Sequence, residues 1–124
     1  MTIKFTAAID PLPQPRPRFA KGHVYNGDRA TAHYRYEVKQ AAIIAMADAE
    51  PIEGAIACTL KFYRRFTSTA QRFGDVDNLA KSTLDALQGT AYRNDSQVTS
   101  LLIQKFQDRE NPRVEVSIEP ADAQ

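Results

Sequence analysis

Three aspartates of this sequence are spaced so that they could act on a phosphate ester through a shared metal ion. Asp75 and Asp77 are two residues apart, so their side chains point the same way if this segment is extended. Asp95 follows in the connection after the next expected helix. If the three carboxylates meet, their mutual repulsion favours a bound cation, and Mg²⁺ or Mn²⁺ prefers oxygen ligands. Such an ion polarises a phosphodiester and lowers the pKa of a bound water.

A lysine accompanies these acids at helical spacing. Lys81 lies four residues after Asp77 and four before Asp85, so the three side chains share one face of a helix. In a catalytic interpretation, Lys81 faces the metal site and meets the charge that develops on the scissile phosphate. The alternative is an exposed Asp–Lys–Asp ladder worth about 0.2–0.5 kcal/mol per pair. Asp77 or Asn78 also suits a helix N-cap, so spacing alone leaves both interpretations open.

Length and composition limit the class of protein. The chain has 124 residues, of which 43% are hydrophobic, so we expect one domain over residues 1–124 with one core. A net charge of +1 excludes a histone-like polycation, and the lone Cys58 excludes an intrachain disulfide. No apolar run approaches the roughly 18 residues of a membrane span, and the N-terminus lacks a signal-peptide pattern. We therefore expect a cytoplasmic protein.

Basic residues are concentrated in two segments despite the balanced total. Residues 1–40 contain seven basic and three acidic residues, and residues 61–75 contain four basic residues and one acidic. A nucleic-acid backbone needs local rather than overall positive charge, although ordinary solvated faces give the same pattern. Phe19 and Tyr25 lie among the first group and suit stacking on bases. The candidate DNA-binding residues are Arg16, Arg18, Lys21, Arg64, Arg65 and Arg72.

Hydrophobic periodicity predicts four main strands and two helices. Alternation predicts strands over residues 2–9, 54–66, 97–107 and 112–119, with the last two joined as an antiparallel hairpin. Helices are expected from Thr31, as N-cap, to Pro51, and from Asn78 to Gln88 with Gly89 as C-cap. A short hairpin is expected around Lys21 and Gly22. The prediction is an α/β (α+β) fold in the order β-α-β-α-β-β: a single mixed β-sheet of about four to five strands with two main helices packed on it.

The first expected helix is apolar on more than one side. Val38, Ala42 and Ala45 form one stripe, and Ile43 and Ile44 widen it. A helix on a domain surface buries one side only, so we expect the second apolar side to contact a partner subunit. A symmetric homodimer would supply such a partner.

The central motif resembles one known nuclease family. Asp75-Val-Asp77-Asn78-Leu-Ala-Lys81, then Asp85-Ala-Leu87, then Asn94-Asp95-Ser-Gln-Val98 are similar to the RusA family of Holliday-junction resolvases. The upstream Pro13-Gln-Pro-Arg16-Pro-Arg18-Phe19 and Tyr25 resemble the N-terminal loop of its phage-type members. One departure is Asn94, which stands where many members have another acid and which remains a possible oxygen ligand.

The resemblance implies specific roles for these residues. Asp75, Asp77 and Asp95 match the family's essential metal-binding acids, and Lys81 matches its catalytic lysine. The family forms homodimers, uses Mg²⁺ or Mn²⁺, and cuts paired strands symmetrically at four-way DNA junctions. A bacterial host and a phage or prophage origin are implied as well, with roles in DNA recombination and repair.

Our leading hypothesis is therefore a divalent-metal-dependent endonuclease, a crossover junction endodeoxyribonuclease acting on branched DNA. One alternative is a non-catalytic DNA-binding or assembly protein on the same fold. Another is a metal-dependent nucleotide phosphohydrolase that uses the same acids on a small substrate. The fold by itself does not decide among these three.

Overall fold

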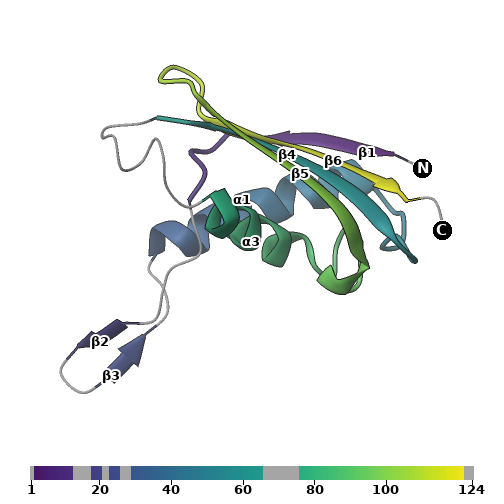
Figure 1. Cartoon of the computed structure of the whole chain (residues 1–124), viewed down its shortest axis with the longest axis horizontal. Coiled ribbons are helices and arrows are strands. Elements are labelled where there is room, and N and C mark those ends of the chain that lie inside the picture. Colours follow the sequence, from purple (N-terminus) through teal and green to yellow (C-terminus); the bar gives the residue numbers. More distant parts are fainter. Residues whose placement is uncertain (1, 13–17, 21–22, 26–28, 66–75, 122–124) are drawn as a thin grey trace.

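Four strands form one mixed β-sheet: β1 (Ile3–Ala7), β4 (Ile56–Arg64), β5 (Val98–Gln107) and β6 (Arg113–Pro120). The computed structural model of the chain describes residues 2–12, 18–20, 23–25, 29–65 and 76–121, and describes residues 18–20 and 23–25 as backbone only. The spatial order is β1-β6-β4-β5 (Figure 1). β6 is antiparallel to both β1 and β4, whereas β4 and β5 are parallel. The predicted α+β fold with one mixed main sheet is confirmed.

The last two strands are consecutive in the chain but do not pair, so the predicted hairpin of residues 97–107 and 112–119 is wrong. β4 lies between them, with Leu60 opposite Ile103 on β5 and Val116 on β6. The inward side chains of β6 are at most 2% exposed, and its position between two strands buries them. The mostly exposed β5 occupies an edge instead. The turn at residues 108–111 predicts a chain reversal but does not specify which strand lies next to it.

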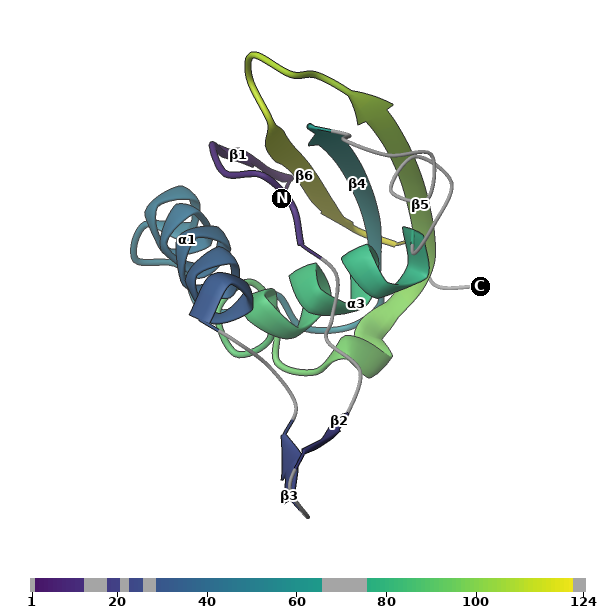
Figure 2. The same ribbon diagram turned by 90° about the vertical axis from the view of Figure 1, so that its left-hand side faces the viewer.

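Two helices cover the same face of this sheet (Figure 2). They are α1 (Arg29–Met46) and α3 (Val76–Leu87). Because β4 and β5 are parallel, the chain has to return along the sheet between them, and α3 lies in this crossover. Among the described residues, no helix covers the opposite face of the sheet. One face of α3 is therefore directed into the core, and the rest of its surface is free to carry polar residues.

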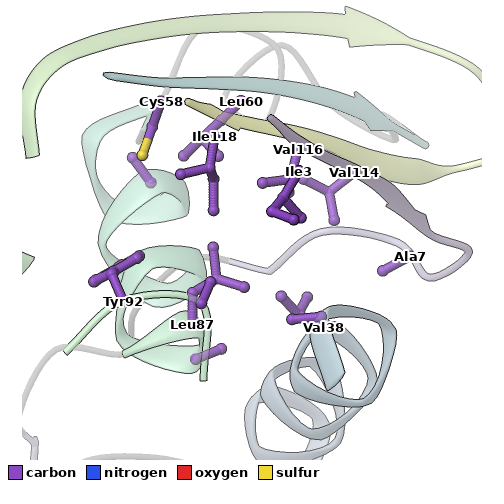
Figure 3. Close-up of a cluster of buried hydrophobic side chains, with 14 of the residues drawn as sticks. Ile3, Ala7, Val38, Cys58, Leu60, Leu87, Tyr92, Val114, Val116 and Ile118 are labelled. Atoms are coloured by element: carbon purple, nitrogen blue, oxygen red, sulfur yellow. The ribbon is translucent and has the colours of Figure 1, made fainter. Parts of the chain in front are cut away.

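The core lies between the sheet and the two helices (Figure 3). Leu60 and Ile118 point from the sheet towards Val38 of α1 and Leu87 of α3, and all four side chains are 0% exposed. The predicted alternation of residues 54–66 is confirmed, because Ile56, Cys58, Leu60 and Phe62 are buried. Removal of this apolar surface from water is the main force holding the helices to the sheet.

The first helix differs from its prediction at both ends. It begins at Arg29, so Thr31 is not the N-cap but an internal residue with 6% exposure. It ends at Met46, before the predicted stop at Pro51, because Ala47 adopts a left-handed φ of 51°. The amide of Ala47 donates a hydrogen bond to the Ile43 carbonyl at 3.1 Å. This arrangement closes the last turn of the helix.

The short N-terminal hairpin is confirmed as backbone structure. β2 (Arg18–Ala20) pairs antiparallel with β3 (His23–Tyr25), and Phe19 is opposite Val24. Lys21 and Gly22 lie outside the described residues. Figure 1 shows this hairpin apart from the main sheet and the helices. In the described part of the chain, no helix combines the length and apolar character needed to cross a membrane.

A buried hydrogen bond joins the two helices. The Tyr34 hydroxyl of α1 lies 2.7 Å from Thr83 Oγ1 of α3, and Thr83 Oγ1 donates to the Leu79 carbonyl at 2.9 Å. Tyr34 is therefore the donor in the first bond. Both side chains are 0% exposed, and burial raises the pKa of the Tyr34 hydroxyl well above its ordinary value. The bond fixes α3 against α1, and with it every residue that α3 presents to solvent.

We expect the two partners of this bond to respond unequally to substitution. Tyr34→Phe leaves the Thr83 hydroxyl bonded to Leu79, so the free energy of unfolding should fall by only about 0.5–1.5 kcal/mol. Thr83→Val leaves the Tyr34 hydroxyl buried without an acceptor and should cost about 1–3 kcal/mol. Urea unfolding measures both values. The double variant should be no less stable than Thr83→Val alone, and a fully additive loss would contradict this assignment.

Candidate active site

The polar face of α3 carries the predicted acids and lysine. The buried residues of this helix are Leu79, Ala80, Ser82, Thr83, Ala86 and Leu87. Asp77, Lys81 and Asp85 line a common cavity, as their i, i+4, i+8 spacing predicts. Within the described residues, Lys81 has no carboxylate within ion-pairing distance. The side chains therefore do not form the Asp–Lys–Asp ladder of the alternative interpretation.

Asp95 faces the same cavity from a different element. It begins a single 3₁₀ turn, η1 (Asp95–Gln97), that leads directly into β5. The cavity has a volume of about 230 Å³ and is bordered by α3, η1 and β5. Four apolar side chains and four charged ones line it: Ala80, Leu84, Leu101, Ile103, Asp77, Lys81, Asp85 and Asp95. The fold thus brings Asp77, Lys81 and Asp95 to one hollow, although they are separated in sequence by up to 18 residues.

The chain reverses after α3 because of two anchors. Gly89 has a left-handed φ of 88°, as expected of the predicted C-cap, and its amide donates to the Tyr92 carbonyl at 2.6 Å. Tyr92 is 0% exposed, and its hydroxyl donates to the Leu84 carbonyl at 2.6 Å. Burial raises the pKa of the Tyr92 hydroxyl, and the nearby carboxylates of Asp95 and Asp85 raise it further. The reversal holds Asp95 close to the helix that it follows.

The turn that carries Asp95 has its own capping arrangement. Asn94 is the N-cap of η1, and its Oδ1 accepts the Ser96 amide at 2.9 Å. The Gln97 side chain accepts the Asn94 amide in return, which completes a capping box. Asn94 therefore has a structural role at the position considered above as an additional oxygen ligand. The Asn-x-x-Gln spacing is a signal from which this cap could have been predicted.

The donor set matches a hard divalent cation in chemistry. Asp77, Asp85 and Asp95 supply oxygen atoms, and neither His nor Cys lines the cavity. The part of the chain that the structure describes contains no group of three His, Cys, Asp or Glu residues close enough to hold one ion. Asp75, the remaining expected ligand, lies outside the described residues. Of the three predicted metal ligands, the structure therefore describes Asp77 and Asp95.

The carboxylate of Asp108, beside another hollow, has structural partners. Asp108 lies in the connection between β5 and β6, beside a larger hollow of about 670 Å³. Its carboxylate accepts the Asn111 amide at 2.9 Å and the Arg113 guanidinium at 2.9 Å, and these bonds lower its pKa. No comparable bond reaches the side chains of Asp77, Asp85 or Asp95 from the described residues. The smaller cavity, rather than the larger one, is therefore the candidate site.

The predicted DNA-binding residues have different environments. Arg65 is exposed beyond the end of β4, where its amide donates to Asp10 Oδ1 at 3.3 Å and its Nε to the Arg109 carbonyl at 3.0 Å. Arg64 is only 8% exposed, because the alternation of β4 turns it inward, so it has little surface for a phosphate. Arg18 belongs to β2, whose side chains are not described. Arg16, Lys21 and Arg72 lie outside the described residues.

Comparisons with known proteins cover nearly the whole chain. The profile of the family described as Endodeoxyribonuclease RusA matches residues 8–119 of the chain. An uncharacterized protein, YqaN of Bacillus subtilis (strain 168), is 32% identical over an alignment that covers 98% of each chain. The family match includes α3, η1 and β5, which are the three elements around the cavity.

We expect the reversal at Gly89 to depend on its backbone conformation. Nothing lies within 4 Å of an added Cβ, so any penalty comes from the left-handed φ and not from a clash. Gly89→Ala should lower the free energy of unfolding by about 1–2 kcal/mol, measured by urea unfolding. Gly89→Asn should cost less, because asparagine tolerates this conformation. Equal losses for Ala and Asn would argue against the conformational explanation.

Proposed function

The chain belongs to the RusA family of endodeoxyribonucleases, and from this premise we propose that it is a divalent-metal-dependent endonuclease, a single nuclease domain over residues 1–124, that resolves four-way DNA junctions. Family membership implies an endonuclease that acts on branched DNA. The observation that carries the finer proposal is the joint presence of Asp77, Lys81 and Asp95 on one cavity. Proposed along with it are a role in DNA recombination and repair and a phage or prophage origin.

Asp75, Asp77 and Asp95 are the proposed ligands of Mg²⁺ or Mn²⁺. When bound, the ion would polarise the scissile phosphodiester and lower the pKa of a water. Lys81 places a positive charge beside the acids, where it stabilises the negative charge that develops on the phosphate. Leu84, Leu101 and Ile103 form an apolar lining beside Asp77, Lys81 and Asp95, whose own side chains are exposed to solvent. The chain thus combines ligands, a cation and an apolar wall.

Basic residues outside the cavity are the proposed contacts to a DNA backbone. Arg65 is the exposed member of the predicted set, and Arg16, Arg18, Lys21 and Arg72 are proposed as further contacts. The burial of Arg64 supports an indirect role for this residue, beneath the strand end that carries Arg65. Contacts of this kind position the nucleic acid but do not read its sequence.

The proposal predicts the loss of cleavage without the loss of binding when an acid is neutralised. Asp75→Asn, Asp77→Asn or Asp95→Asn should each slow cleavage of a labelled four-way junction in Mg²⁺ by about 100- to 1,000-fold. Junction binding measured in EDTA should be unchanged or tighter, because the variant repels phosphates less. Asp48→Asn, at an exposed position after α1, is the matched control and should cleave normally.

A wild-type cleavage rate for Asp75→Asn would contradict the assignment. Binding without metal-dependent cleavage of any junction, flap or linear duplex would instead favour the non-catalytic DNA-binding protein. Phosphate release from a free nucleotide, with junction DNA intact, would favour the nucleotide phosphohydrolase. Removal of Mg²⁺ with EDTA should stop cleavage by the unaltered protein.

We also propose that the protein acts as a homodimer through the outer side of α1. Ile44 is 79% exposed, Tyr36 is 58% exposed and Ile43 is 42% exposed, which is unusual for large apolar side chains on one helix. A two-fold interface there would bury them against their copies.

Sedimentation measurements test this interface directly. Ile44→Glu should convert the dimer to a monomer, because a charge at the centre of an apolar contact is not solvated. Ala8→Glu adds the same charge at an exposed position after β1 and should leave the dimer intact. A dimeric Ile44→Glu variant would exclude this side of α1 as the interface.

A further inference from the structure

The main chain around Asp95 is held by three side chains. Gln97 Oε1 accepts the amides of Arg93 and Asn94, at 2.8 and 2.9 Å. Gln88 Oε1 accepts the Asp95 amide at 2.9 Å. The Ser96 amide is bonded to Asn94 Oδ1, and the next two amides are bonded to main-chain carbonyls within the turn. Every amide from residue 93 to residue 98 thus has an acceptor.

Gln88 joins this turn to the helix that carries the other site residues. It follows Leu87, the last residue of α3, and its own amide donates to the Leu84 carbonyl at 3.2 Å. Its side chain then reaches the amide of Asp95 itself. Since Asp77 and Lys81 belong to α3, this one hydrogen bond links the backbone of Asp95 to the element that presents them.

Gln97 joins the same turn to the segment before β4. Its Nε2 donates to the carbonyls of Ile52 and Gly54, at 2.8 and 2.9 Å. Its Oε1 accepts two amides, so both donors and both acceptor positions of the amide group are in use. A glutamate would lack the donors and a leucine would lack all four bonds. The half-buried Gln97 side chain therefore acts as a four-point clamp.

We propose that Gln88 and Gln97 are positioning residues that hold the Asp95 carboxylate at the cavity in the geometry needed to bind the metal ion. This inference rests on the proposed function, because it assumes that Asp95 is a ligand. Asp95 is exposed on a short turn, and Asp77 and Asp85 line the same cavity. The two glutamines fix this turn through its backbone and do not line the cavity themselves.

Binding of Mn²⁺ alone, followed by calorimetry without DNA, separates this role from general stability. Gln88→Leu and Gln97→Leu should each weaken Mn²⁺ binding by about 10- to 100-fold, the usual effect of removing a group that orients a ligand. Gln104→Leu is the matched control and should bind Mn²⁺ normally. Gln104 is exposed on the face of β5 opposite to Leu101 and Ile103, which line the cavity. Gln88→Leu removes only the side-chain hydrogen bond to the Asp95 amide. This variant alone can therefore test the proposal if Gln97→Leu fails to fold.

A second readout needs no metal. Hydrogen exchange of the Asp95 amide in metal-free protein should accelerate in Gln88→Leu but not in Gln88→Glu, which keeps the acceptor oxygen. Normal Mn²⁺ binding by Gln88→Leu and Gln97→Leu, with weakened binding by Asp95→Asn, would overturn the positioning role and leave the proposed function standing. Normal binding by Asp95→Asn as well would overturn the metal site and the positioning role together.

Discussion

The placement of three carboxylates and one lysine around one small hollow is the constraint on which the proposed chemistry depends. Asp77, Asp85 and Asp95 line a cavity of about 230 Å³, so three carboxylates border one space. Lys81 brings a positive charge to the same cavity without an ion pair to any of them within the described residues. The scaffold sets the relative positions of these groups, because it ties the elements that carry them to the core. Carboxylate oxygens are the ligands that a hard divalent cation prefers, which is why this arrangement suits metal chemistry.

The scaffold fixes the cavity from two sides. α3 is pinned by its buried face and by the bond from Tyr34 to Thr83, so Asp77 and Lys81 have a fixed platform. The segment after α3 is anchored by the buried Tyr92 and by the side chains of Gln88 and Gln97. Both sides of the cavity are thereby tied to the core between the sheet and the helices. Placement of chemical groups on well-packed elements is the general route to a pre-organised site.

Much of the fold follows from periodicity, and the errors have specific causes. β4 alternates strictly between buried and half-buried residues, so its inner face could be predicted without a structure. The strands next to β6 could not be predicted in this way. The alternation of Val114, Val116 and Ile118 shows that β6 has one buried face, but it does not specify which strands lie on either side of it. Likewise, threonine is a residue type that is favoured at N-caps, yet Thr31 is buried within α1. Tertiary packing outweighs this local preference for the N-cap position. Strand partners and helix ends depend on contacts between distant residues.

For the candidate site, the amino-acid sequence alone determined the types of residue and their places on one helical face. Asp77, Lys81 and Asp85 had to lie together once α3 formed, because i, i+4 spacing is a property of any helix. Only the tertiary structure decided that Asp95 faces the same cavity, since this depends on a left-handed Gly89, a buried Tyr92 and two glutamine side chains. Those contacts join residues up to 45 positions apart in the chain. Local periodicity carries no information over such separations, because it reports one element at a time and not the packing between elements.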